Sequence, residues 1–540
     1  MSSADLVFTG GRIFTADAVR TQPTSVAVAG GRIVAVGNDE VLELIGPDTE
    51  VVQLNGRMLV PGFQDAHVHP VWGGLDLMRC DLSEDRTRDD YLARIGAYAA
   101  ANPDLPWVLG GGWSMAVFPG GTPLASDLDR VVPDRPAFLP NRDGHGAWVN
   151  SKALELAGLT KDSPDPVDGR IERDADGNPS GTLHEGAMSL VNRYLPESSD
   201  DEVIEALLLG QKYLQSFGIT AWQDAIIGAY SDAGDASPAY MAGALWWDRL
   251  RGLEQIPELV AQRERLQHGK FAATTIKIMQ DGVAENFTAA MIEPYIDPHN
   301  HGGHGSGLSF VDVAILNEAV PQLDALGFQV HFHAIGDRAV RECLDAVERA
   351  RQRNGLRGNR HHIAHLQVVH PDDIARFREL DVTANMQMLW AALETQMVEL
   401  TLPFIGPERA AWQYPFGDLM RSGATLACGS DWSVSTPNPM AAIHVAVNRV
   451  TAPGQEDTVF DPFLPEQAID LATALTAYTA GSAYVNGSED SGIIAVGYVA
   501  DFALLDRDPF EAPASEIGLT RIDATYIDGA AIYTRSDLAE

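Results

Sequence analysis

The sequence predicts an α/β protein whose central unit is a distorted (β/α)8 TIM barrel. Three observations support this prediction. Short apolar strands alternate with amphipathic helical segments through most of the chain, both ends consist of hairpin-like strands, and a long insertion interrupts the alternation after the first strand. With 540 residues, of which 45% are hydrophobic, the chain can build a large buried core.

The two ends of the chain are predicted to form one β-sandwich domain. Residues 1–60 contain short apolar strands separated by Gly-Gly or Asn-Gly pairs, which favour tight hairpin turns. Residues 487–540 return to the same pattern. Because unpaired strand edges are unfavourable, we expect the strands of these two segments to pair with each other.

The middle of the chain contains eight candidate strands. They are expected at residues 62–69, 218–224, 244–250, 274–281, 328–334, 361–367, 382–388 and 424–431. Helices are expected at 311–327 and 337–355, because both segments carry apolar residues at helical spacing and end at a glycine. Strands that alternate with helices favour a parallel sheet, and eight such units predict a barrel comprising residues 61–74 and 211–486.

Residues 75–210, between the first and second strands, are too long for an ordinary barrel connection. The segment is rich in Pro, Gly, Asp and Trp. We expect it to form an inserted cap or substrate domain, because insertions after a barrel strand lie over the active face.

The charge balance excludes several classes of partner. The chain has 38 Lys and Arg residues against 75 Asp and Glu residues, for a net charge of −37. Such an acidic protein is not expected to bind nucleic acid or an anionic membrane, which leaves a small molecule as the expected partner. The N-terminus lacks a signal-peptide pattern, and the three cysteines form no CxxC pair. These features predict a cytoplasmic protein without disulfides.

Ionisable side chains recur at the ends of the predicted strands. They are His67, His69, Lys277, His333, His365 and Asp431. Residues i and i+2 of a strand share a face, so His67 and His69 can both point into the barrel mouth. Imidazoles and a carboxylate are ligands that Zn²⁺ or a similar metal prefers. Buried structural histidines are the alternative, but they would not explain why these side chains recur on separate strand ends.

Several motifs together carry a resemblance to a known family. They lie at residues 61–70, 275–282, 333–340, 361–367, 429–440 and 492–510, with three more in the predicted insertion. The chain resembles the amidohydrolase superfamily, in particular the branch of large metal-dependent hydrolases similar to N-substituted formamide deformylases. The similarity runs essentially from end to end. It implies a metal-bearing distorted barrel beside a β-sandwich, which agrees with the layout predicted above.

The resemblance also implies roles for the strand-end residues. The metal ligands would be His67, His69, Lys277, His333, His365 and Asp431. Asp431 would also shuttle the proton, and Lys277 matches a position that related enzymes often carry as an Nζ-carboxylated lysine between two metals. One or two Zn²⁺ ions per chain are expected, with Mn²⁺ or Fe²⁺ as alternatives. A homodimer is the family's usual assembly.

The sixth predicted strand departs from the branch pattern. The branch usually shows an Arg and a Glu before the ligand histidine, where this chain has His362 and Ala364. The fifth strand carries His331 as well as its ligand histidine. By strand parity, His331 lies one layer deeper, where it is expected to be a hydrogen-bonded interior residue rather than a metal ligand, and it is also a candidate substrate contact.

Other aromatic and histidine residues are candidates for the substrate pocket. His145 lies in an insertion motif and is predicted to be catalytic, as a donor to the oxyanion. Trp113, Trp148 and Trp390 are expected either to line an apolar pocket or to belong to the core. The His- and Gly-rich segment 297–307 is expected to be a solvated loop rather than a metal site.

The predicted activity is hydrolysis of a C–N bond in an N-substituted amide or formamide by metal-activated hydroxide. Asp431 is expected to take the proton of the attacking water and return it to the leaving nitrogen. A mononuclear deaminase acting on a heterocycle is the first alternative, and the presence of Lys277 argues against it. A non-catalytic scaffold with the same fold is the second, and the complete set of ligand positions argues against that.

Overall fold

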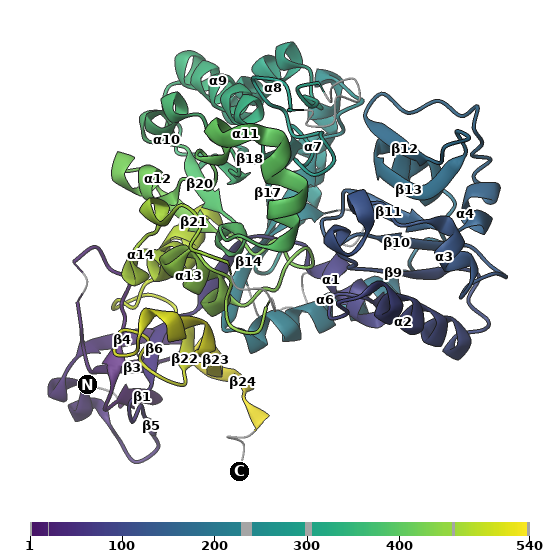
Figure 1. The fold of residues 1–540 in the computed structure, drawn as a ribbon. Coiled ribbons are helices and arrows are strands. Elements are labelled where there is room, and N and C mark those ends of the chain that lie inside the picture. The colour runs from purple at the N-terminus through teal and green to yellow at the C-terminus, as the bar shows by residue number, and fades with distance from the viewer. Residues whose placement is uncertain (1–2, 20, 228–239, 297–304, 456–459, 537–540) are drawn as a thin grey trace.

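The computed structural model describes residues 3–19, 21–227, 240–296, 305–455 and 460–536. At its centre lies a parallel sheet curved into a nearly closed barrel (Figure 1). The eight barrel strands, in order around the sheet, are β7 (Phe63–Val68), β14 (Ile219–Ile227), β15 (Tyr240–Trp246), β17 (Phe271–Met279), β18 (Gln329–Ala334), β19 (His362–His365), β20 (Thr383–Met386) and β21 (Leu426–Cys428). The predicted fold class is confirmed.

The barrel is closed where β7 meets the segment that follows β21. The Asp431 amide donates to the His67 carbonyl at 2.8 Å. The carboxylate of Asp65, on β7, accepts the amides of both His67 and Ser430, at 3.0 and 3.1 Å. One buried side chain therefore binds the first strand to the last and sets the spacing between His67 and Asp431.

The third barrel strand lies earlier in the chain than predicted. The apolar pattern indicated 244–250, whereas β15 spans Tyr240–Trp246. The chain turns directly afterwards, where the Asp248 amide donates to the Gln255 side chain and the Arg251 amide to the Asp248 carbonyl. Trp247 lies outside the strand but is fully buried. Its apolar side chain therefore indicates a buried position and does not show that the strand continues. The other strands overlap their predicted ranges.

Helices on the outside of the barrel cover the sheet (Figure 1). The structure confirms both predicted helices as α8 (Val313–Ala325) and α9 (Asp337–Asn354). The following glycines, Gly327 and Gly355, have φ of 78° and 71°, which glycine adopts without a steric cost. Further helices here are α6 (Asp200–Ser216), α7 (Ile256–Arg265), α10 (Ile374–Glu379), α12 (Phe416–Ser422) and α13 (Pro439–Asn448). Among the described residues, no helix combines the length and apolar character needed to cross a bilayer.

Strands from both chain ends share a sheet. It consists of β2 (Arg12–Ile13), β6 (Met58–Pro61), β22 (Phe502–Leu505), β23 (Ile522–Ile527) and β24 (Ala530–Thr534). A second sheet consists of β1 (Leu6–Thr9), β3 (Ser25–Ala29), β4 (Arg32–Gly37) and β5 (Glu50–Gln53). Phe8 packs edge-on against Phe502 and Tyr526, with ring centroids 5.3 and 5.1 Å away. The pairing of the two termini is thus present, while the domain limits at 60 and 487 stay a prediction.

The predicted insertion carries its own sheet, with strands β8 (Cys80–Asp81), β9 (Val108–Gly111), β10 (Ala137–Pro140), β11 (Gly146–Val149), β12 (Gly169–Arg173) and β13 (Pro179–Glu185). Figure 1 shows this sheet and the terminal sheets on different sides of the barrel. Helix α2 (Arg88–Ala101) packs on the sheet through buried residues such as Tyr91 and Ile95. The insertion therefore has a separate hydrophobic core, and its limits at 75 and 210 stay a prediction.

Replacing Phe8 with Ala should destabilise the terminal sheets. The free energy of unfolding, taken from the transition in which these sheets unfold, should fall by about 3–5 kcal/mol. The reason is that Phe8 is fully buried and its removal leaves a cavity between strands of the two chain ends. Urea denaturation followed by circular dichroism measures the change. Val19→Ala is the control, because Val19 is 80% exposed. Equal stability of the two variants would contradict a shared core.

Candidate metal centre

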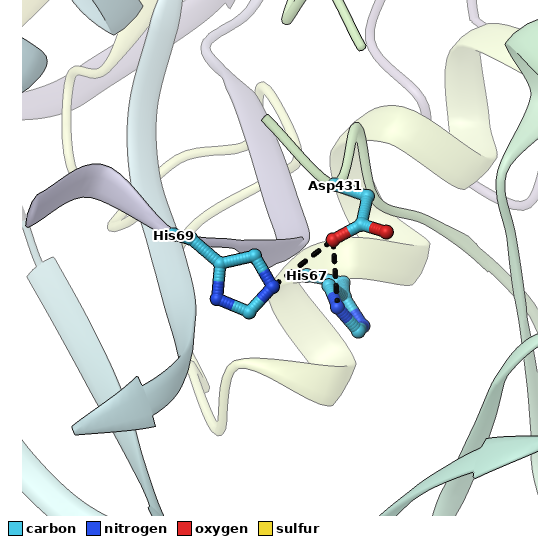
Figure 2. Close-up of side chains that lie close together, drawn as sticks. All are labelled: His67, His69 and Asp431. Atoms are coloured by element: carbon cyan, nitrogen blue, oxygen red, sulfur yellow. Dashed lines mark ion pairs between the residues drawn. The ribbon is translucent and has the colours of Figure 1, made fainter. Parts of the chain in front are cut away.

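Three predicted ligands converge at the mouth of the barrel. His67 is the next-to-last residue of β7, His69 precedes α1 (Pro70–Met78), and Asp431 follows β21. Oδ1 of Asp431 lies 3.1 Å from Nε2 of His67 and 3.0 Å from Nε2 of His69 (Figure 2). All three side chains are buried, and their ligand atoms lie within 4.8 Å of one another. This geometry matches a site in which one cation is held by two imidazoles and a carboxylate.

The histidines of strands five and six extend this cluster. The ring of His365 lies 4.7 Å from that of His67 and 4.4 Å from that of His333, measured between centroids. Nδ1 of His365 is 3.9 Å from Oδ2 of Asp431. The ends of four barrel strands therefore bring their imidazoles and carboxylate to one place.

Lys277, on β17, also reaches the cluster. Its Nζ atom lies 3.5 Å from Nε2 of His67, and its side chain is buried. Burial lowers the pKa of Lys277 to about 7, because a buried ammonium loses its hydration. The structure thus brings together all six side chains that the sequence singled out as ligands.

The hydrogen bonding of the cluster fits a metal cation. Nδ1 of His69 and both ring nitrogens of His365 are buried without a hydrogen-bond partner among the described residues, and Oδ1 of Asp431 faces the ring nitrogens of His67 and His69. Unpaired buried polar atoms are costly, and such groups usually have a partner in native proteins. A divalent cation beside the Asp431 carboxylate would balance its charge and would supply a partner for one ring nitrogen of His365. The residues present therefore fit the metal that the sequence predicted.

The backbone is strained at the strand ends that carry the ligands. His365 and Leu366 have φ of 80° and 52°, and Asp431 has φ of 56°. Residues with a Cβ rarely adopt this left-handed region, and such strain concentrates at functional sites. The His365 amide donates to Oε1 of Gln387 at 2.5 Å, which holds this conformation.

Asp281 is a site residue for which the sequence analysis gave no role. Its Oδ1 lies 3.2 Å from Nδ1 of His333, and its carboxylate also accepts the amides of Ile335, Gly336 and Ala290. Because Nδ1 of His333 donates to Asp281, Nε2 remains available for a metal. Burial raises the pKa of Asp281 to about 7. Its position at the last residue of the predicted strand 274–281 was the available signal.

His145 reaches the site from the insertion. Its Nδ1 lies 3.0 Å from both carboxylate oxygens of Glu185, and its ring centroid is 5.6 Å from that of His333. Burial by itself would lower the pKa of His145, but the Glu185 carboxylate raises it above its usual value. Glu185 also accepts from Thr288 at 2.8 Å, which fastens the insertion to the loop after β17. Glu185 was not among the residues predicted for the site, although it is the last residue of the insertion motif at 169–185.

The predicted aromatic residues separate into two groups. Trp390 is partly exposed and stacks on His365, with ring centroids 5.4 Å apart and planes 3° apart. Trp113 is fully buried in the core of the insertion, where its indole N–H donates to the Leu139 carbonyl. Trp148 lies in the same core. The expectation that Trp113 lines the substrate pocket is therefore corrected, since its surface is covered by neighbouring side chains.

His331 lies beneath the cluster and not at its open side. It is fully buried, and its Nε2 and Nδ1 lie 2.8 Å from Nδ1 of His67 and 2.7 Å from Oε1 of Gln223. With both nitrogens engaged, it is an interior residue, which corrects its assignment as a substrate contact. The histidines of segment 297–304 lie outside the described residues.

The barrel with a buried imidazole–carboxylate cluster at its mouth defines a metal-dependent hydrolase. The chain matches the amidohydrolase family over residues 50–533 and belongs to that family. It is 32% identical to the protein LONG AFTER FAR-RED 3 of Arabidopsis thaliana (98% of this chain, 92% of the relative) and 31% identical to YtcJ of Bacillus subtilis (98% and 99%). It is 26% identical to the N-substituted formamide deformylase of Arthrobacter pascens (98% and 99%).

A solved structure agrees with this assignment. A metal-dependent hydrolase from Pyrococcus furiosus superposes with a TM-score of 0.70 at 25% identity, over 94% of this chain and all of that one. The fold, the family and the predicted class of enzyme, a hydrolase acting on carbon–nitrogen bonds, are thereby established.

Protein purified without chelator should contain about one or two divalent metal ions per chain. His69→Asn should weaken the binding of Zn²⁺ by at least about 100-fold, because it removes a direct ligand and not an outer partner. Elemental analysis and titration against a chromophoric chelator measure the two quantities. His268→Asn is the control, since His268 is exposed on β16 (Gln267–His268). A wild-type protein that stays metal-free in excess Zn²⁺ or Mn²⁺ would overturn this site.

Proposed function

We propose that this protein is a Zn²⁺-dependent hydrolase of N-substituted amides, with N-substituted formamides as the first substrates to test. The observation that carries the proposal is the convergence of His67, His69 and Asp431, with Lys277 beside them. The deformylase relative supports this substrate class, because it matches along almost its whole length. Bound at this cluster, the metal would supply Lewis acidity toward a carbonyl and a water molecule.

Asp431 is placed to move the proton of the reaction. Burial by itself would raise the pKa of Asp431, but His67 and the other imidazoles hold it well below its usual range. The group is therefore a carboxylate at neutral pH, and its Oδ1 faces the two strand-one histidines. We assign it to take the proton from the attacking water and to deliver it to the leaving nitrogen.

His145 is placed to stabilise negative charge on the substrate. Its Nδ1 faces Glu185, which leaves Nε2 as the donor for a developing oxyanion. Burial by itself would lower the pKa of His145, but the Glu185 carboxylate raises it, so the imidazole keeps this donor to higher pH than it would without Glu185. Trp390, stacked on His365, offers an apolar wall for the N-substituent.

A mononuclear deaminase remains the alternative reaction, and Lys277 distinguishes the two. Its Nζ lies 3.5 Å from Nε2 of His67, so a carboxylated Lys277 would add an anionic ligand to the cluster and favour a second metal ion. A metal content near two per chain favours the amide hydrolase. A content near one would put heterocyclic amidines into the substrate screen.

Asp431→Asn should lower kcat by about 10²–10⁴-fold, because an amide cannot shuttle the proton. Turnover of N-substituted formamides is measured together with the metal content of the same sample. Because Asp431 is also a ligand, the comparison is made with both proteins in excess Zn²⁺, where the remaining histidines are expected to keep the metal content within about twofold of wild type. Asp372→Asn is the control, because the Asp372 side chain is 83% exposed. Undiminished turnover in Asp431→Asn would remove the proton-shuttle role.

Glu185→Gln should move the alkaline limb of the kcat/KM profile to lower pH. The Glu185 carboxylate raises the pKa of His145, so its removal lets the imidazole lose its proton at a lower pH. The pH dependence of kcat/KM measures the shift. Thr288→Val is the control, because it removes one hydrogen bond to Glu185 and keeps the charge. An unchanged limb in Glu185→Gln would show that His145 is not the group that titrates.

A further inference from the structure

A chain of buried polar side chains runs through the barrel interior beneath the metal cluster. We call it the amide relay, and it consists of Gln329, Gln223, His331, His362 and Asn385. Every member is at least nine-tenths buried. Such a network is costly unless each polar atom has a partner, so its hydrogen bonds define which atoms donate and which accept.

The relay begins at Gln329, whose orientation is fixed by the backbone. Its Nε2 donates to the carbonyls of Arg360 and Val485, both at 2.8 Å. A carbonyl oxygen only accepts, so the amide nitrogen must face these two groups. Oε1 of Gln329 consequently faces the barrel interior, where it accepts from Thr275 at 2.7 Å and from Nε2 of Gln223 at 2.9 Å.

The orientation of the Gln329 amide fixes that of Gln223, and Gln223 in turn contacts two histidines. Because its Nε2 donates to Gln329, its Oε1 faces Nδ1 of His331 at 2.7 Å and Nε2 of His362 at 3.1 Å. An amide oxygen only accepts, so both of these ring nitrogens carry hydrogen. The tautomers of His331 and His362 are therefore set by a single amide group.

The arm through His362 gives an independent check of this assignment. With hydrogen on Nε2, the Nδ1 atom of a neutral His362 is an acceptor, and it faces Nδ2 of Asn385 at 3.2 Å. The same Asn385 amide donates to the carbonyl of Ala66 at 3.0 Å, which requires its nitrogen to lie on this side. Gln329 and Asn385 are oriented by different backbone carbonyls. Both orientations require the same tautomer of His362, with hydrogen on Nε2.

The arm through His331 ends at a metal ligand. A neutral His331 with hydrogen on Nδ1 has a lone pair on Nε2, which lies 2.8 Å from Nδ1 of His67. His67 must therefore donate from Nδ1. Its lone pair is then on Nε2, the atom that lies 3.1 Å from Oδ1 of Asp431.

We propose that Gln223 and Gln329 are positioning residues that hold His67 in the Nδ1–H tautomer, so that its Nε2 lone pair faces the metal position before the metal binds. This inference rests on the assignment of His67 as a ligand. Without the relay, His67 would exchange between tautomers, and the form with hydrogen on Nε2 has no lone pair at the atom that faces the metal position.

Two variants test the proposal. Gln223→Met removes the acceptor that faces His331 and His362, and Gln329→Met removes the group that orients Gln223. Both are expected to lower the affinity for Zn²⁺ by about 10–100-fold, the usual effect of losing an outer partner of a ligand histidine. Gln467→Met is the matched control, because Gln467 is a buried glutamine bonded only to Asp418 in the part of the chain described. Circular dichroism and thermal melting check that each variant is folded.

A second readout reports the tautomer directly. Nitrogen NMR of histidine-labelled protein, freed of metal with a chelator, should show His67 with a protonated Nδ1 in the wild type. Comparison with His67→Asn identifies its signals. Both relay variants should show a mixture of tautomers, whereas Gln467→Met should match the wild type. Unfolding would change the signals of all the histidines, whereas loss of the relay should change the tautomer of His67 in a folded protein. The measurement therefore distinguishes a positioning role from a loss of stability.

The outcomes distinguish the relay from the site it serves. Folded relay variants that keep wild-type Zn²⁺ affinity and a single Nδ1–H tautomer would overturn the proposal. If His69→Asn also kept wild-type affinity, the metal site itself would be misassigned. Loss of affinity in His69→Asn together with unchanged relay variants would refute only the relay.

Discussion

The structure depends on the contact that closes the barrel between its first and last strands. The Asp65 carboxylate and the Asp431 amide join β7 to the segment after β21. The same contact places the two strand-one histidines against the carboxylate of Asp431, so barrel closure and metal binding share one set of atoms. A substitution that broke the contact between β7 and the segment after β21 would therefore also separate His67 and His69 from Asp431.

The histidines of the cluster are buried, and this burial determines their protonation state. Deep burial disfavours charge on the imidazoles, and the pKa of His67 is lowered to about 3. Neutral imidazoles and one carboxylate present lone pairs to a common centre, where several polar atoms have no partner among the described residues. A divalent cation would stabilise this arrangement, while a proton would satisfy only one atom of it. The residues of the barrel mouth therefore suit a divalent metal.

The insertion contributes His145 and Glu185, which lie beside the histidine cluster of the barrel. Thr288 and Asn286 of the loop after β17 bind these two residues through hydrogen bonds. The imidazole of His145 therefore reaches the histidine cluster from a segment separate from the barrel strands.

The sequence alone predicted seven of the eight barrel strands close to their places, two of the helices, and the six side chains that meet at the barrel mouth, because period-two alternation, glycine stops and strand-end position are local properties. Only the tertiary structure decided that Trp113 is a core residue and His331 an interior one, and that Asp281 and Glu185 orient the site histidines. These roles depend on which distant strands and loops a side chain meets. That choice follows from barrel closure and from the docking of the insertion, whose long-range contacts leave no periodic signal in the chain.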